Sequence, residues 1–184
     1  MRRAVLAVIA LLLSYSSAAA CVGKTLVIGA TESPESRVVA QVIAILINER
    51  TGTSVKIQDF PDGEEIHRAL ATGSLDIAVE RTDQALERLG LGAAADAQAA
   101  YLQAKAGYLE RLNLVWLPPL GPAGGGAALA APVVRKDTVK KFPALPRLIA
   151  KTEGLLSADV VAALTRSGEP ARSARQFLRE KKLI

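Results

Sequence analysis

Apolar residues in the first part of the chain follow two different spacings. Residues 25–30 form a short, almost continuous apolar run, which is typical of a buried strand. Residues 34–48 instead place apolar side chains at helical spacing, at Val38, Val39, Val42, Ile43 and Leu46. Ser33 before Pro34 predicts the start of this helix, and Gly52 predicts its end. The pattern therefore predicts a strand followed by a helix with defined ends.

The same alternation continues to residue 117. Residues 54–60 predict a second strand. Asp62 and Glu65 form a capping-box pattern at the start of a helix that ends near Gly73. Two more strands are predicted over residues 76–79 and 114–117, with helices over residues 82–89 and 94–112 between them. Strands that alternate with helices in this way indicate a parallel or mostly parallel sheet covered on both faces.

The composition changes after residue 117. Residues 118–132 are rich in Pro, Gly and Ala and predict a loop or linker around the glycines at 124–126. A fifth short strand is predicted over residues 131–135, and Asp137 and Ser157 are candidate N-caps of later helices. The C-terminal third is predicted to be helical, with a break at residues 168–170 and core positions Val160, Leu164, Phe177 and Leu178. The fold class is α/β, with a Rossmann-like sheet of about five strands.

The N-terminus carries the pattern of a secretory signal. Arg2 and Arg3 precede an apolar run over residues 4–13, and small residues follow at 16–20. This run is shorter than the roughly 20 residues that a transmembrane helix needs. We therefore expect export with removal of residues 1–20, which leaves residues 21–184 as a single domain.

Cys21 is the only cysteine, so it has no partner for a disulfide within the chain. It directly follows Ala18, Ala19 and Ala20, a tripeptide similar to the cleavage motif of bacterial lipoproteins. One interpretation is a free thiol at the new N-terminus, and the other is a lipid-modified residue that anchors the protein. We favour the second, which predicts a lipoprotein in the periplasm or at the cell surface.

Charge and residue types exclude several classes of function. The formal net charge of +5 falls once Arg2 and Arg3 are removed, and the basic residues are scattered, so nucleic-acid binding is not indicated. His67 is the only histidine, which leaves little from which to build a metal cluster or a histidine-dependent triad. The glycines at 124–126 lack the strand and helix context of a nucleotide-binding loop. We expect no enzymatic activity, no metal and no cofactor.

Candidate binding residues lie where predicted strands end. Ligands of parallel sheets bind beyond the carboxyl ends of the strands, close to helix N-termini. The candidates at this rim are Thr31, Ser33, Glu35, Arg37, Phe60, Glu80, Arg81 and Thr82. An alternative for Ser33 and Thr82 is that they only cap helices. Arg37 and Arg81 either pair with Glu35 or Glu80 or face a ligand.

Several segments resemble, in order and spacing, the substrate-binding proteins of ABC importers for glycine betaine, choline and related quaternary amines. These segments are residues 25–30, 51–52, 66–70, 73–77, 80–86, 114–121 and 131–137. The resemblance implies a periplasmic-binding-protein type II fold, a small-molecule solute and the membrane subunits of an importer as partners. Uptake of such solutes for osmoprotection is the function that the resemblance implies.

The sequence differs from this family first in lacking a segment long enough to form a second lobe. Members of the family carry a second lobe between the segments that correspond to Gly121 and Ala131, whereas here only the Pro, Gly and Ala residues of 122–130 are present. The expected protein is a single lobe. A single lobe leaves exposed a face that its partner lobe would cover, so a homodimer is a further hypothesis.

A second departure concerns the ligand. The family holds a quaternary ammonium in a cage of aromatic side chains by cation–π attraction. Ser33, Arg37 and Arg81 stand here where the family tends to have aromatic residues, and Trp116 is expected to lie in the core. An anionic solute bound by the two arginines is therefore a variant hypothesis. The alternative function is an interaction module, without solute binding, that contacts a partner protein or itself.

Overall fold

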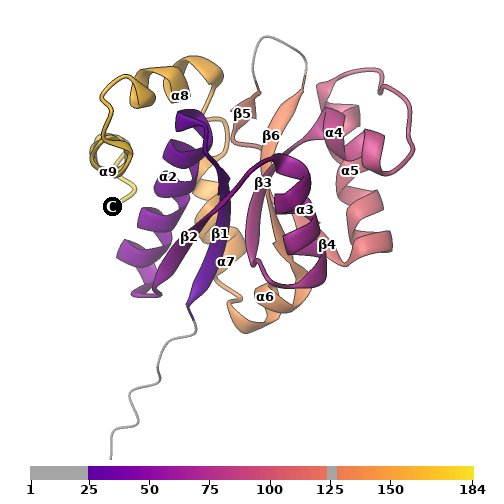
Figure 1. Ribbon diagram of the computed structural model, residues 1–184, viewed down its shortest axis with the longest axis horizontal. Helices are drawn as coiled ribbons and strands as arrows, with labels where there is room; N and C mark the ends of the chain where they lie inside the picture. Colours follow the sequence, from indigo (N-terminus) through magenta and orange to yellow (C-terminus); the bar gives the residue numbers. More distant parts are fainter. Residues whose placement is uncertain (1–24, 124–127) are drawn as a thin grey trace, which may run out of the picture.

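A six-stranded sheet separates two groups of helices in the computed structural model, which describes residues 25–123 and 128–184 (Figure 1). The strands are β1 (Leu26–Thr31), β2 (Val55–Phe60), β3 (Ile77–Arg81), β4 (Leu114–Trp116), β5 (Gly121–Pro122) and β6 (Leu129–Arg135). Their order across the sheet is β2-β1-β3-β6-β4, and the short β5 pairs with β6 beyond the end of β4.

Most strands of the sheet run in one direction. β1 is parallel to β2 and β3, while β6 is antiparallel to both β3 and β4. β4 therefore points the same way as the first three strands, and among the described strands β6 alone is reversed. This arrangement confirms the expected mostly parallel α/β sheet.

Helices cover both faces, as the alternation predicted. One face carries α2 (Pro34–Thr51), α7 (Leu145–Ile149), α8 (Ala158–Thr165) and α9 (Pro170–Glu180), and the other carries α3 (Gly63–Thr72), α4 (Thr82–Arg88) and α5 (Ala97–Leu112). α6 (Lys136–Lys141) follows β6 at the lower edge of the sheet in Figure 1, and the 3₁₀ turn Ala150–Thr152 follows α7. Within the described ranges, no helix combines the length and the apolar character that crossing a membrane requires.

The caps read from the sequence set the ends of two helices. The Ser33 side chain accepts the amide hydrogen of Ser36 at the start of α2, and Gly52 ends that helix with a φ of 69°. Asp62 accepts the Glu65 amide in the same way at the start of α3. The reciprocal half of the expected capping box does not form, because the Glu65 carboxylate instead pairs with Arg68.

Side-chain alternation along the strands divides the core into two layers. Leu26, Ile28 and Ala30 of β1 pack against α2 and the C-terminal helices. Val27 faces the opposite layer with α3, α4 and α5, and so does the predicted core residue Trp116. Phe177 and Leu178 are buried as expected, whereas Val160 and Leu164 are only partly buried.

The expected linker over residues 122–130 is wrong in part. Gly121 pairs with Ala130 and Pro122 with Leu129, and the Ala123 amide donates to the Ala128 carbonyl. These contacts make the segment an antiparallel hairpin, and β6 begins at Leu129 rather than at residue 131. The glycines at 124–126 lie outside the described residues.

The two candidate caps in the C-terminal half also differ from expectation. Asp137 lies inside the first turn of α6, after the N-cap Arg135, and its carboxylate forms two hydrogen bonds with that guanidinium. This pairing holds the pKa of Asp137 well below its usual range. Ser157 is at the N-cap of α8 as predicted, but its side chain makes no capping hydrogen bond.

Truncation of Leu178 tests whether the last helix belongs to the same core. Leu178 is fully buried where α9 packs on α2, so Leu178→Ala should lower the free energy of unfolding by about 2–5 kcal/mol. Arg172→Ala on the exposed side of α9 is the matched control and should change it by less than about 0.5 kcal/mol. Urea unfolding measures both, and equal effects of the two substitutions would contradict the packing.

Candidate functional site

The predicted residues lie near the carboxyl ends of β1, β2 and β3, but they are divided between the two faces of the sheet. At the end of β1, the Thr31 amide donates to Ser36 Oγ at 2.9 Å, and the hydroxyls of Thr31 and Ser33 lie 3.1 Å apart. Ser33 Oγ also accepts the Ser36 amide at 3.2 Å. Both predicted hydroxyls therefore hold the turn between β1 and α2 in place.

Arg37 has a partner that the sequence did not indicate. Its Nη2 lies 3.1 Å from Oδ2 of Asp59, and both side chains are about half exposed. The parallel register pairs Ala30 with Asp59 and Thr31 with Phe60, so the end of β2 is brought beside the start of α2. Arg37 therefore pairs with neither Glu35 nor Glu80. Phe60, the next residue, packs against the layer of α3 to α5.

Glu80 is buried, with 4% of its surface exposed, on the side of the sheet covered by α3, α4 and α5. Its carboxylate accepts hydrogen bonds from Tyr108 Oη at 2.8 Å and Arg88 Nη1 at 3.0 Å, and it lies 3.0 Å from His67 Nδ1. These contacts satisfy a buried carboxylate, whose desolvation would otherwise be costly. Glu80 thus joins three helices to the sheet.

Thr82 is also buried, and its role is to hold the hairpin. It is the first residue of α4, after the N-cap Arg81, so it is not the cap that the sequence suggested as an alternative. Its Oγ1 accepts the amide hydrogen of Leu129 at 3.0 Å. The start of α4 is therefore fixed to the start of β6.

A cavity of about 340 Å³, here called the rim cavity, lies between the ends of β1 and β3, the hairpin and the N-termini of α2 and α8. Three polar residues line it, namely Glu35, Ser36 and Arg81. The remaining wall is apolar or backbone and consists of Gly29, Val39, Ala40, Val79, Leu120, Pro122, Ala123, Ala130, Leu156, Ala158 and Val161. Two of the predicted site residues, Glu35 and Arg81, thus line the same apolar cavity.

Arg81 faces the rim cavity because strand residues alternate between the faces of a sheet. Glu80 points to one face, and Arg81 shares the other with Val79. Its guanidinium binds both carboxylate oxygens of Asp83, at 3.0 and 2.6 Å, and this hydrogen bonding raises the pKa of Arg81. Nη1 reaches the Ala123 carbonyl at 3.4 Å, a long contact. The bond to Asp83 fixes the side chain and leaves Nη1 weakly engaged.

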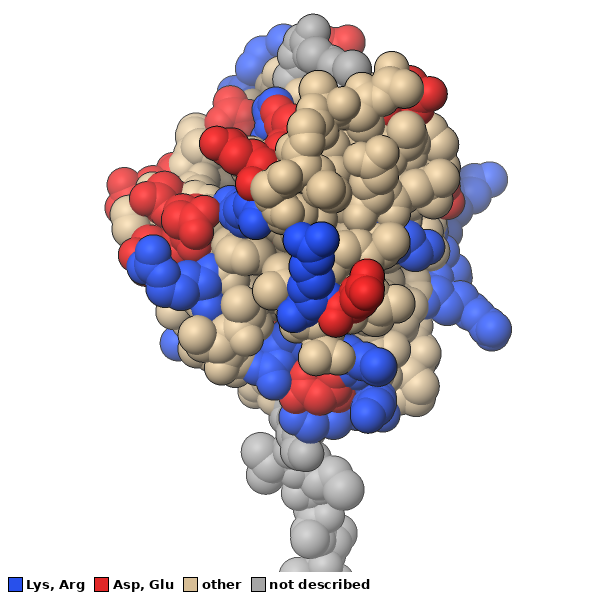
Figure 2. Space-filling model, turned by 90° about the vertical axis from the view of Figure 1, so that its right-hand side faces the viewer, with Lys and Arg blue, Asp and Glu red and all other residues tan. Residues whose placement is uncertain are grey.

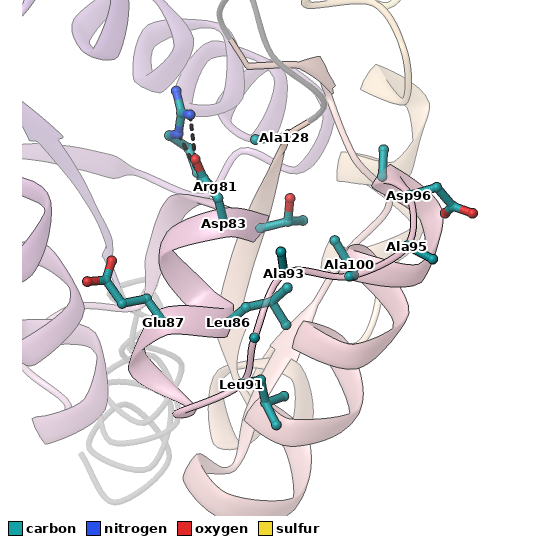
Figure 3. A pocket seen from close by; sticks show the side chains of 14 residues that line it. Arg81, Asp83, Leu86, Glu87, Leu91, Ala93, Ala95, Asp96, Ala100 and Ala128 are labelled. Atoms are coloured by element: carbon teal, nitrogen blue, oxygen red, sulfur yellow. Dashed lines mark hydrogen bonds and ion pairs between the residues drawn. The ribbon is translucent and has the colours of Figure 1, made fainter.

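A second hollow of about 500 Å³ lies on the other side of Arg81, between α4, α5 and the loop that joins them (Figure 3). Its walls are Leu86, Leu91 and the alanine-rich residues 93–97, with carboxylates at Asp83, Glu87 and Asp96. The sequence analysis did not identify this hollow. The one signal was the run of small residues at 93–97, because alanines between two helices leave space unfilled.

Comparison with known proteins identifies a matching family and a similar transport protein. Residues 24–129 match the family described as the substrate binding domain of the ABC-type glycine betaine transport system. The carnitine transport binding protein OpuCC of Listeria monocytogenes is 32% identical over 122 residues, which cover 64% of this chain. The chain spans 38% of the length of that relative.

Solved structures share the fold at low sequence identity. A crystal structure of a glycine betaine/carnitine/choline ABC transporter has a TM-score of 0.79 at 13% identity and covers 86% of this chain and 99% of its own. Apo YehZ from Escherichia coli has a TM-score of 0.77 at 14% identity, covering 88% and 100%. Lactococcal OpuAC, in complex with glycine betaine, has a TM-score of 0.56 at 12% identity, covering 86% and 96%. The fold is that of the type II periplasmic binding proteins, as expected.

The burial of Tyr108 beside Glu80 predicts that the stability of the protein falls at alkaline pH. Burial, reinforced by the charge of Glu80, raises the pKa of Tyr108 above its ordinary value of 10.0. The unfolded chain loses this proton near pH 10.0 while the folded chain keeps it, so the stabilisation is present below that pH and is lost as pH rises above it.

Tyr108→Phe should therefore be less stable at neutral pH, by about 1–3 kcal/mol, because the Glu80 carboxylate loses a donor. It should also lose less further stability above pH 10.0 than the unsubstituted protein does. Urea unfolding on either side of that pH measures both effects. Identical pH slopes for the two proteins would contradict the assignment.

Proposed function

The chain belongs to the family of substrate-binding domains of ABC-type glycine betaine transport systems, and from this membership we propose that it binds a quaternary amine for an importer. The members of this family are the substrate-binding parts of transport systems. The observation that carries the proposal for this chain is the rim cavity, where a carboxylate and a guanidinium share an apolar wall. The solutes we propose are glycine betaine and related compounds such as choline and carnitine.

The chemistry of a zwitterionic amine fits these side chains. A quaternary ammonium has no N–H donor, so it is bound through charge and apolar contact rather than through hydrogen bonds. Glu35 supplies the negative charge, and Val79 and the apolar wall supply the contact. A planar guanidinium such as that of Arg81 pairs well with a carboxylate. Glycine betaine carries both groups and is therefore the preferred ligand over choline, which has no carboxylate.

The proposed cation site differs from an aromatic cage. Among the described residues that line the rim cavity, none is aromatic. Phe60 and Trp116, the nearby aromatic residues, pack against the layer of α3 to α5. The charge of Glu35 takes the part that cation–π attraction plays in a cage. Because Glu35 is exposed, water screens its charge, and we expect modest affinity.

We further propose that residues 21–184 form a single lobe. Residues 122–130 stand at the place in the chain where related proteins carry a second lobe. The hairpin of β5 and β6 supports this proposal, because it pairs the two sides of that segment directly. A single lobe leaves one side of the ligand in water, and buried ligand surface is a main source of affinity for small molecules. The membrane subunits of the importer are the partners that we propose for the loaded lobe.

Two other functions remain as alternatives. An interaction module without solute binding is favoured by the rim residues that already have partners, namely Thr31, Ser33 and Arg37. An anionic solute is favoured by Arg81, whose Nη1 makes only a long hydrogen bond. The rim cavity favours solute binding over an interaction module. The negative charge of Glu35 favours a solute with a cationic group over an anionic solute.

The sequence pattern of the N-terminus supports a location outside the cytoplasm. We propose that the protein is exported to the periplasm or cell surface, that residues 1–20 are removed, and that Cys21 carries a lipid anchor. These residues lie outside the described part of the chain, so the proposal rests on the sequence alone.

Ligand-induced stabilisation tests the solute proposal. Glycine betaine should raise the thermal unfolding midpoint of the purified protein, and saturation at a hundredfold excess over the dissociation constant corresponds to about 2.7 kcal/mol. Choline should give a smaller shift, because it lacks the carboxylate that Arg81 would bind. Arg81→Gln should reduce the glycine betaine shift and leave the smaller choline shift unchanged.

Arg37→Gln is the matched control, since Arg37 is a rim arginine that does not line the cavity. It should leave both shifts unchanged. The proposal fails if none of these amines stabilises the protein at millimolar concentration. Stabilisation by simple organic acids alone would instead identify an anionic solute.

Replacement of Cys21 tests the anchor. Cys21→Ser should move the protein from the membrane fraction to the soluble exported fraction and abolish incorporation of labelled fatty acid, because serine offers no thiol for acylation. Retention in the membrane fraction after the substitution would contradict the lipoprotein assignment. Glycine betaine binding is independent of this outcome.

A further inference from the structure

The outer face of α5 exposes an unusual row of apolar side chains. Leu102 and Leu109 are 52% and 44% exposed, although leucine is usually buried. Ala99 and Ala106 are on the same side of the helix, one turn from each leucine. We call these four residues the α5 stripe. Figure 2, which faces the side of the molecule carrying α4 and α5, shows a broad area with few charged side chains there.

The α5 stripe has the spacing of a coiled-coil seam. From Ala99 to Leu109 its residues follow each other at intervals of three, four and three, which places the alanines at a positions and the leucines at d positions of a heptad. The opposite face of α5 holds Tyr101, Ala104 and Tyr108 in the core. Packing against this molecule's own sheet therefore does not account for the outer row.

Opposite charges flank the stripe. Lys105 precedes an a position and Glu110 follows a d position, so they occupy the g and e positions of the heptad. Lys105 Nζ lies 5.7 Å from the centre of the Tyr101 ring, on the Tyr101 side of the stripe. Within residues 25–123 and 128–184, neither Lys105 nor Glu110 has an ion-pair partner in its own chain. Both charges are available to a second molecule.

We infer that the α5 stripe is a dimer interface, at which α5 of a second copy packs in parallel about a two-fold axis along the helix. In a parallel pair, the g residue of one helix faces the e residue five positions later in its partner, so Lys105 meets Glu110 of the second copy, twice by symmetry. In an antiparallel pair, like flanks face each other, and Lys105 would meet Lys105. The arrangement of charges therefore selects both the partner and its orientation.

The dimer is compatible with an open rim cavity. α5 contributes no residue to that cavity, whose walls come from α2, α8, the strands and the hairpin. The parallel orientation also points both rims in the same direction. The α5 stripe spans only residues 99–109, and such a contact is smaller than the roughly 1,200–2,000 Å² buried in stable interfaces, so the dimer is reversible.

Sedimentation analysis over a range of concentrations tests the interface. The purified chain should pass from monomer to dimer as its concentration rises. Lys105→Glu and Glu110→Lys should each weaken dimerisation by about tenfold, because each leaves like charges facing across the seam. An equimolar mixture of the two variants should associate as tightly as the unsubstituted protein, since both ion pairs form again in the mixed dimer.

Two further variants control for the apolar contact. Leu102→Gln combined with Leu109→Gln should leave the protein monomeric, with a circular dichroism spectrum that matches the parent protein. Leu91→Gln, which changes an exposed leucine outside the α5 stripe, should leave the dimer intact. A protein that is monomeric at every concentration, or a dimer unaffected by the Leu102 and Leu109 changes, would overturn the inference. A mixture that associates more tightly than the parent protein would overturn the parallel orientation.

Discussion

The burial of α2 on nearly all sides is the constraint on which the rest of the fold depends. Residues 42–47 of this helix are buried without interruption, so one side packs on the sheet and the other must be covered by α7, α8 and α9. A helix that is apolar all round cannot face water, and the C-terminal helices complete its burial. The N-terminus of α2 carries Glu35 to the rim. The position of the proposed cation site thus follows from the packing of this helix.

Electrostatics differ on the two sides of β3. Glu80 points into the layer of α3 to α5, where His67, Arg88 and Tyr108 satisfy its carboxylate in a dry environment. The next residue, Arg81, points to the opposite face and pairs with Asp83 near solvent. Two adjacent charged residues therefore have separate roles. One fixes helices to the sheet, and the other faces the rim cavity.

Most of the helices and strands could be predicted because their ends carry local signals. Ser33 and Gly52 mark α2, and Asp62 marks α3, since caps act on backbone groups only a few residues away. The hairpin of β5 and β6 escaped prediction because Gly121 and Pro122 have no strand pattern, and their pairing is imposed by β6. The sequence placed candidate residues at the rim, but it did not show which side chains share a cavity, because this depends on the face to which each strand residue points.

Gly121 links the hairpin to the far wall of the rim cavity. Its φ is 153°, and a side chain there would come within 3.0–3.1 Å of the backbone of Leu156 and Ser157, just before α8. The Leu120 carbonyl also accepts the Leu156 amide, which ties the two segments together. A larger residue at 121 would require this backbone segment before α8 to shift by a few tenths of an ångström. Leu156 and Ala158 line the rim cavity, so natural variation at Gly121 would change the width of this cavity although Gly121 itself does not line it.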